Sequence, residues 1–150
     1  MSYTIGEALI LTRVQAVSGY DSNNTSRANW LILNSGKSDH YAILRPGEFS
    51  LPWLTITRYL ANWTTVIEVW QQYTTDVASR TNLYAQVATL LASLQTYPHL
   101  GDGANSSILD AAITGGPEPT ENWTAGGGPI WLRWNLNVLW KEEIEVTFAE

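Results

Sequence analysis

The last part of the chain, residues 130–148, alternates apolar and polar side chains with a period of two. This alternation is typical of a β-strand with one buried face, because successive side chains of a strand point to opposite sides. The apolar side chains occupy the even positions, where Glu142 is the single exception. At roughly 3.3 Å per residue the strand would extend about 60 Å, whereas a compact domain of this length spans only about 40 Å. We therefore expect it either to bend near residues 141–143 or to leave the domain and pair with another subunit.

Composition and charge limit the classes of protein to which the chain can belong. A hydrophobic content of 45% and a charged content of 15%, with no shift in composition along the chain, predict a single folded domain over residues 1–150. The net charge of −6 is concentrated in the second half, which carries nine acidic and three basic residues, against five of each in the first half. This acidic balance argues against binding to a nucleic-acid backbone, which needs clustered Lys and Arg.

Cysteine usage and hydropathy restrict the cellular setting. The sequence has no cysteine, which excludes disulfides and thiolate chemistry. No apolar stretch approaches eighteen residues, so we expect no membrane-spanning helix. The first residues lack the basic and apolar regions of a secretory signal, so we expect synthesis in the cytoplasm.

Periodicity predicts the order of secondary structure elements. Helical spacing of apolar residues predicts two main helices, over residues 5–17 and 76–96, the second with Asp76 as its N-cap. Strands are predicted over residues 30–33 and 41–44, joined by a hairpin, then over 54–59, 64–73, 107–114 and the final run. The Gly- and Pro-rich residues 115–129 are predicted to form a loop. This order predicts an α+β fold, a mainly antiparallel twisted β-sheet with the two main helices packed on one face.

No residue pattern indicates catalysis or a bound cofactor. His40 and His99 lack metal-ligand neighbours, no serine lies in a nucleophile elbow, and the glycines at 126–128 precede a strand, not the helix of a phosphate loop. The glutamates near the end of the chain could serve glycoside hydrolysis or hold calcium, but a solvated strand edge is the simpler interpretation. The sequence therefore predicts a protein that is not an enzyme, with no catalytic residue, no metal and no cofactor.

Eight tryptophans are the remaining unusual feature of the composition. Trp134 and Trp140 lie in the buried register of the final strand, and Trp131 lies on the opposite face. Trp123 lies in the predicted loop, where an exposed indole is a good contact anchor. We therefore predict Trp123 and Trp131 as contacts between subunits.

The order of these parts resembles the tail terminator, or tail completion, proteins of long-tailed bacteriophages. The resemblance rests on the N-terminal helix, the segment 41–47, the second helix ending near residues 94–100, the segment 111–117, the Gly/Pro loop and the aromatic strand 129–140. It implies a homo-oligomeric ring, usually hexameric, in the tail or neck of the virion. It also implies that the ring caps the tail tube protein, joins it to the head connector or neck protein, and lets DNA pass through its pore without specific binding.

Charge suggests how such a ring would be built. An acidic inner wall repels DNA phosphates, so carboxylates are the candidates for the pore lining: Asp76, Glu142, Glu143 and Glu145. Opposition between the basic residues of the first half and the acidic second half favours head-to-tail packing, the geometry that closes into a ring. From that basic set, Arg45 and Arg58 join Trp123 and Trp131 as candidate interface residues.

Three alternatives remain open at this level. A neck or stopper adaptor, which completes the head, would also be small, β-rich and ring-forming. A carbohydrate-binding module would use tryptophans and a neutral polar surface. A small hydrolase would use the C-terminal carboxylates.

Overall fold

The computed structural model describes residues 3–52, 55, 57–96, 108–115, 121–124 and 130–145, with backbone alone for 59, 108–115 and 121–124. Within these ranges two α-helices, one 3₁₀ helix and six strands form the predicted α+β fold. In chain order they are α1 (Tyr3–Gln15), β1 (Thr25–Arg27), the 3₁₀ helix η1 (Trp30–Asn34), β2 (His40–Pro46), β3 (Arg58–Gln72), α2 (Asp76–Gln95), β4 (Ile108–Gly115), β5 (Glu121–Thr124) and β6 (Ile130–Glu145).

The strands form one sheet in the order β1-β2-β3-β6-β4, and β5 pairs with β6. β1 runs parallel to β2, whereas β2 with β3, β3 with β6, β4 with β6 and β5 with β6 are antiparallel. The sheet is therefore mixed, with the two longest strands at its centre.

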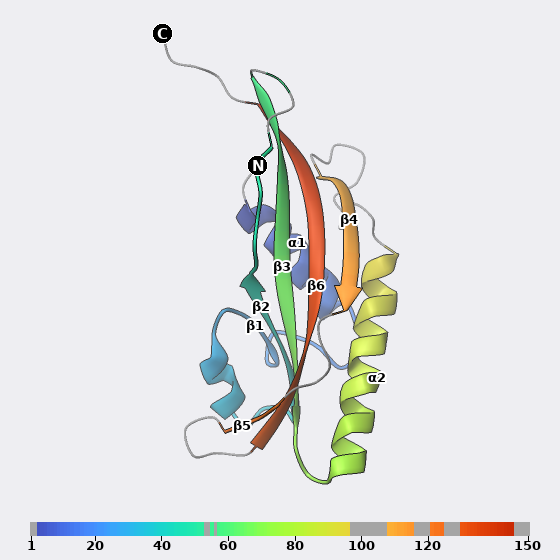
Figure 1. Ribbon diagram of the computed structural model, residues 1–150. Coiled ribbons are helices and arrows are strands. Elements are labelled where there is room, and N and C mark those ends of the chain that lie inside the picture. The colour runs from blue at the N-terminus through green and yellow to red at the C-terminus, as the bar shows by residue number, and fades with distance from the viewer. Residues whose placement is uncertain are drawn as a thin grey trace.

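The final strand neither bends into a hairpin nor leaves the domain, which corrects the expectation from its length. Over its described residues it stays paired with β3, from Trp131 opposite Gln72 to Glu145 opposite Arg58. Figure 1 shows these two strands side by side along the whole length of the molecule. The expectation failed because it assumed a compact shape, whereas the long pair makes the molecule elongated. Residues 146–148 of the predicted strand lie outside the described ranges.

Both predicted helices are confirmed within two or three residues of their ends. α2 begins at Asp76 as expected, but its N-cap is Thr75, whose side chain accepts a hydrogen bond from the backbone N–H of Ala78. Asp76 is thus the first helical residue and not the cap. α1 begins at Tyr3, two residues before the predicted start, and ends at Gln15.

Several short elements differ from the prediction. Residues 30–33 belong to η1, not to a strand, because the side chain of Asn29 caps the backbone N–H of Leu31 and so starts a helical turn. No hairpin therefore joins them to β2. The strands predicted over 54–59 and 64–73 are in the structure one continuous strand from Arg58, while residues 54 and 56 lie outside the described ranges. β5 lies in the segment predicted as a loop, and β1 lies between the first two predicted elements, where no strand was predicted.

The main hydrophobic core lies between the sheet and the two helices. α1 contributes Ile10 and Val14, and α2 contributes the predicted apolar face of Leu83, Val87, Leu90 and Leu94. From β6 the sheet contributes Leu132, Leu136, Val138 and the fully buried Trp140, which confirms the predicted place of Trp140 in the core, and the half-buried Trp134 packs against this cluster.

A smaller cluster lies on the opposite face of the sheet. It consists of Leu33 from η1 together with Tyr41, Ile43, Trp70 and Trp131 from the strands. η1 therefore covers one end of this second face.

Candidate functional site

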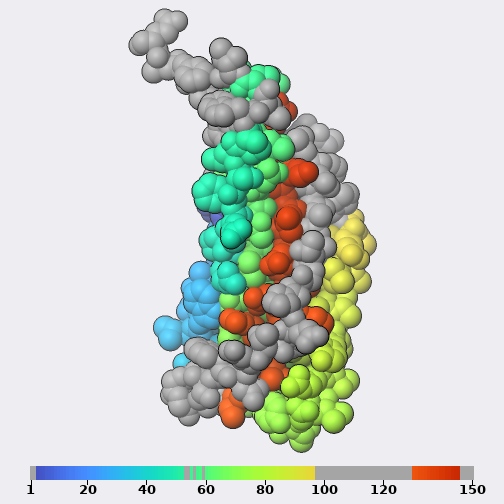
Figure 2. Space-filling model, in the orientation of Figure 1, coloured from blue at the N-terminus to red at the C-terminus, as the bar shows by residue number. Residues whose placement is uncertain are grey.

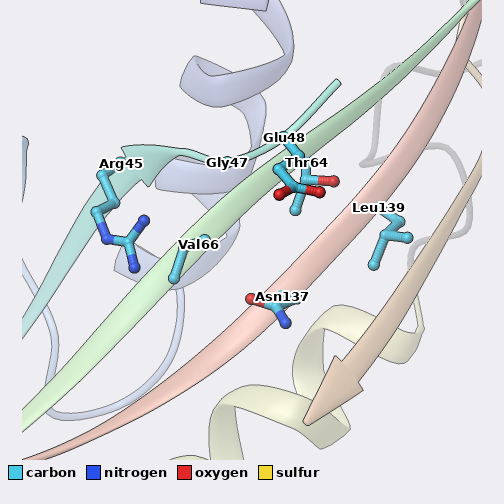
Figure 3. A pocket seen from close by; sticks show the side chains of 7 residues that line it. All are labelled: Arg45, Gly47, Glu48, Thr64, Val66, Asn137 and Leu139. Atoms are coloured by element: carbon cyan, nitrogen blue, oxygen red, sulfur yellow. The ribbon is translucent and has the colours of Figure 1, made fainter. Parts of the chain in front are cut away.

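The second face of the sheet is open beyond η1. Figure 2 shows β2, β3 and β6 reaching the surface there along much of the molecule. The face holds a groove of about 360 Å³ between the end of β2 and the middle of β3 and β6. Figure 3 shows the residues that line it, which are Arg45, Gly47, Glu48, Thr64, Val66, Asn137 and Leu139. We take this groove as the candidate functional site.

A buried carboxylate holds one wall of the groove in place. Glu68 is almost fully buried next to η1, and its oxygens accept hydrogen bonds from the Trp30 indole and from Arg45 Nε, both at 2.6 Å. Arg133 also approaches Glu68, at 3.8 Å, and its guanidinium lies over the Trp70 ring at 5.4 Å from the centroid. Because one carboxylate serves two half-exposed guanidiniums, this end of the face is locally positive.

Arg45, predicted as an interface residue, lies in this groove, whereas Arg58 and Trp131 are not among the described residues that line it. Trp131 is only 1% exposed and packs edge-on against Tyr41, with ring centroids 5.4 Å apart. The side chain thus offers no surface to a neighbour in this structure, because η1 covers the face that the sequence left open. Trp123 lies opposite Trp131 in the β5–β6 register, and its side chain lies outside the described residues.

Arg58 is exposed at the far end of β3 and forms an ion pair with Glu143 on β6, at 3.2 Å. Two other arginines of the first half also have carboxylate partners within the chain, Arg27 with Glu7 and Arg45 with Glu68. Glu7 and Glu68 belong to the first half themselves, so of these three pairs only Arg58–Glu143 joins a basic residue of the first half to an acidic residue of the second half. The sequence signal for the Arg58–Glu143 pair was the alternation of side chains along β3 and β6, which places residues 58 and 143 on the same face of the sheet.

Glu142, predicted to line a pore, is instead fully buried on the core face. Its Oε1 accepts a hydrogen bond from the Trp63 indole at 2.8 Å, and within the described residues its Oε2 has no partner. Trp63 packs against Tyr3 and Trp140 at centroid distances of 5.7 and 6.0 Å. The even register that buries the apolar residues of β6 continues through Glu142, so its carboxylate enters the core and does not face a pore.

The remaining three pore candidates do not form one group. Glu143 and Glu145 are exposed at the end of β6, whereas Asp76 follows the opposite end of β3 and pairs with Arg80 at 2.9 Å. Fourteen residue steps of strand separate these ends, which is about 45 Å. Figure 1 shows the first turn of α2 at the lower end of the molecule and the end of β6 near the upper end.

His40, which has no metal-ligand neighbours in the sequence, has a structural role at the start of β2. Its Nε2 lies 2.6 Å from the carbonyl oxygen of Gly19, and its Nδ1 lies 2.7 Å from Asp39 Oδ1. The ring also packs edge-on against Tyr20 at 5.2 Å. His40 therefore ties the segment after α1 to the sheet. His99 lies outside the described ranges.

In the described part of the chain, no group of three His, Asp or Glu side chains is placed to hold a metal ion. No helix among the described residues is long and apolar enough to cross a membrane. A comparison with family models and with curated proteins finds no match to this chain.

Sequence reasoning missed most of the groove. Thr64 is an even-numbered residue of β3, and Asn137 and Leu139 are odd-numbered residues of β6. All three lie on the face of the sheet that turns away from the helices. The period-two pattern of β6 contained this signal, since Leu139 is the one aliphatic residue at an odd position of the strand. The residues that line the groove with Leu139 could be identified only from the register of β3 and β6.

Proposed function

We propose that this chain is a structural virion protein that forms a ring at the head-proximal end of a phage tail tube. The ring terminates the tail and joins it to the head connector. The proposal takes the sheet as a mainly antiparallel, twisted layer that carries both main helices on one face. This arrangement leaves the other face available for contact with neighbouring subunits.

The open sheet face is the observation that carries this proposal. Beyond η1, the face has a groove with Val66 in its floor and the exposed Leu139 on its far side. An exposed apolar surface with polar residues at its rim is typical of a protein contact. An elongated subunit with such a face along its centre suits side-by-side packing in a ring.

Two of the exposed acidic residues keep their proposed role. Glu143 and Glu145 are the candidates for a pore wall that repels DNA phosphates, because they share one end of one face. In this proposal the subunits are made in the host cytoplasm and contact the tail tube protein at one ring face and the connector or neck protein at the other. No membrane takes part.

The mass of the protein in solution tests the proposal. We expect a concentration series to show rings, at about 100 kDa for six subunits of 16.7 kDa each, and electron micrographs to show closed particles with a central hole. A chain that stays monomeric at every concentration and does not bind isolated tail tubes would contradict the proposal. Labelling of intact virions would then separate a tail terminator from a neck adaptor, since both form rings.

The burial of the tryptophans argues against a carbohydrate-binding module. Among the indoles that the structure describes, those of Trp70, Trp131 and Trp140 are buried. Trp30 is partly exposed, but its N–H is occupied by Glu68. A sugar platform needs an exposed aromatic face, and these indoles serve packing instead. Binding of the chain to a glycan array would overturn this interpretation.

A further inference from the structure

We propose that the groove on the open sheet face receives the first turn of α2 from a second copy of this chain. This inference rests on the proposed function, because it names the two surfaces by which neighbouring ring subunits would meet. The inference rests on a match between two surfaces: the charged and apolar side chains of the groove are complementary to the charged and apolar side chains of the first turn of α2.

The groove has two opposite charges beside an apolar floor. Arg45 and Glu48 come from the end of β2 and the segment that follows, so they lie on one wall of the groove (Figure 3). Val66 forms part of the floor, and Leu139 on β6 lies opposite the charged wall and is 41% exposed. The hydrogen bond from Arg45 to Glu68 fixes the position of the arginine while about a third of its side chain stays exposed.

The first turn of α2 has the complementary set. Val77 and Leu31 are the most exposed large apolar side chains described, at 79% and 77%. Only Val77 is flanked by charges, because Asp76 precedes it and Arg80 lies three residues later on the same side of the helix. Asp76 and Arg80 are themselves exposed and 2.9 Å apart.

The two surfaces match in chemistry and in order. Asp76 of one copy would meet Arg45 of the next, Arg80 would meet Glu48, and Val77 would enter between Val66 and Leu139. The Asp76–Arg80 pair has to open for this, which costs little because both side chains are exposed to water, where ion pairs contribute little to stability.

The position of the two surfaces makes the contact directional. The groove lies in the middle of the sheet, whereas the α2 turn lies at one end of the molecule (Figure 1). Because the contact joins two different surfaces of the same chain, it is heterologous. Each copy can therefore bind a further copy, and the row of copies closes into a ring when the rotation between neighbours permits it. A symmetric dimer would leave no groove–turn contact for a third copy.

A pair of matched substitutions tests the turn. We expect Val77→Asp to raise the protein concentration needed for half-assembly at least tenfold, because it places a charge against Val66 and Leu139. Leu31→Asp is the control, since Leu31 is equally exposed but lies on η1, outside the contact. Both residues are on the surface, so circular dichroism should show unchanged folding. Assembly of Val77→Asp at the wild-type concentration would overturn the inference.

Mixing two defective variants tests the directionality. Leu139→Asp should also prevent assembly, yet it keeps an intact α2 turn, while Val77→Asp keeps an intact groove. We expect an equimolar mixture to form a heterodimer and no ring, measured by mass in solution. A mixture that stays monomeric would overturn the groove–turn pairing. If Leu139→Asp does not fold, Asn137→Lys on the same strand replaces it.

The outcomes separate this inference from the proposed function. If the wild-type chain forms rings and Val77→Asp forms them equally well, the rings use other surfaces, so the inference fails and the proposed function stands. If the wild-type chain forms no oligomer, with or without tail tubes, both fail.

An exchange of the charges of the turn, Asp76→Arg with Arg80→Asp, keeps the net charge and should weaken assembly. Unchanged assembly after this exchange would contradict the charge matching.

Discussion

At the scale of single residues, polar groups inside the core decide where the protein is most sensitive to substitution. Trp63 and Trp134 are both half-buried indoles that pack against the core. The N–H of Trp63 donates to the buried Glu142, whereas within the described residues the N–H of Trp134 has no acceptor. The two tryptophans therefore form a matched pair for measuring the worth of one hydrogen bond to a buried carboxylate.

We predict that Trp63→Phe lowers the free energy of unfolding by about 1–3 kcal/mol more than Trp134→Phe does, because it leaves the buried Glu142 carboxylate with no donor among the described residues. Urea unfolding of the two variants measures the difference. Both changes remove a similar ring volume, so packing losses largely cancel. Equal costs would mean that the bond between Trp63 and Glu142 contributes nothing to stability.

A second residue-scale prediction concerns alkaline pH. Burial raises the pKa of the Tyr20 hydroxyl above its ordinary value, and that hydroxyl has no hydrogen-bond partner among the described residues. A pKa that is higher in the folded state gives stability that is fully present below roughly pH 10, the unfolded value. This stability is lost as pH rises further, because the unfolded chain then releases the proton.

We therefore expect the wild-type chain to lose stability above pH 10 more steeply than Tyr20→Phe, by about 1.4 kcal/mol per pH unit. At pH 7 the variant should be as stable as the wild type or slightly more stable, because it removes a buried hydroxyl without a partner. Denaturant unfolding at several pH values measures both effects. Parallel pH profiles would show that Tyr20 ionises equally easily in the two states.

At the scale of secondary structure, the sequence predicted the elements whose pattern is long and missed those that depend on neighbours. α2 and β6 carry clear helical and alternating patterns over 20 and 16 residues, and both were predicted nearly to their ends. β1 and β5 have three and four mostly polar residues, and they are strands only because β2 and β6 offer paired edges. η1 was missed because its apolar residues also suit a strand.

The candidate site was predictable only in part for the same reason. Arg45 was identified from charge alone, but its place in a groove depends on Glu68, which lies 23 residues further along the chain. Glu142 is predicted to line a pore because an acidic wall repels DNA, but the period-two register of β6 places it on the buried face, where the Trp63 indole N–H donates to it. The local pattern thus indicates the burial of Glu142, whereas the partners of both carboxylates come from distant residues that no local pattern encodes.

Close packing of α1 on the sheet gives a prediction at the scale of elements. A β-carbon at Gly6 would overlap the buried ring of Trp140. Alanine is favoured over glycine in a helix by about 1 kcal/mol, yet overpacking typically costs about 1–3 kcal/mol. We therefore expect Gly6→Ala to destabilise the protein to urea. In a Trp140→Leu background the smaller side chain removes the overlap, so the same change should become neutral or stabilising. An equal cost in both backgrounds would contradict this contact.

At the scale of the whole molecule, the pairing of β3 with β6 determines the shape. Both strands run the length of the molecule, and the fifteen residues of β3 are all paired with β6. The sixteen residues of β6 alone span about 50 Å, whereas a compact chain of this size has a radius of gyration near 15 Å and a diameter near 40 Å. Elongation is therefore a direct consequence of continuous pairing, and the shape in solution reports on it.

We predict that X-ray scattering from the Leu139→Asp variant, which should stay monomeric, gives a longest dimension above about 50 Å and a radius of gyration above about 15 Å. The comparison variant is Thr65→Pro, in the middle of β3, where proline removes a backbone donor from the β3–β6 ladder, because the backbone of the neighbouring Thr64 faces Gly47. This second variant should lose cooperative unfolding, because no neighbouring strand can replace the β3–β6 pairing that joins the two ends of the sheet. A compact, spherical scattering profile for the first variant would mean that the strands bend. The open face would then be too short and too curved to align one subunit against the next.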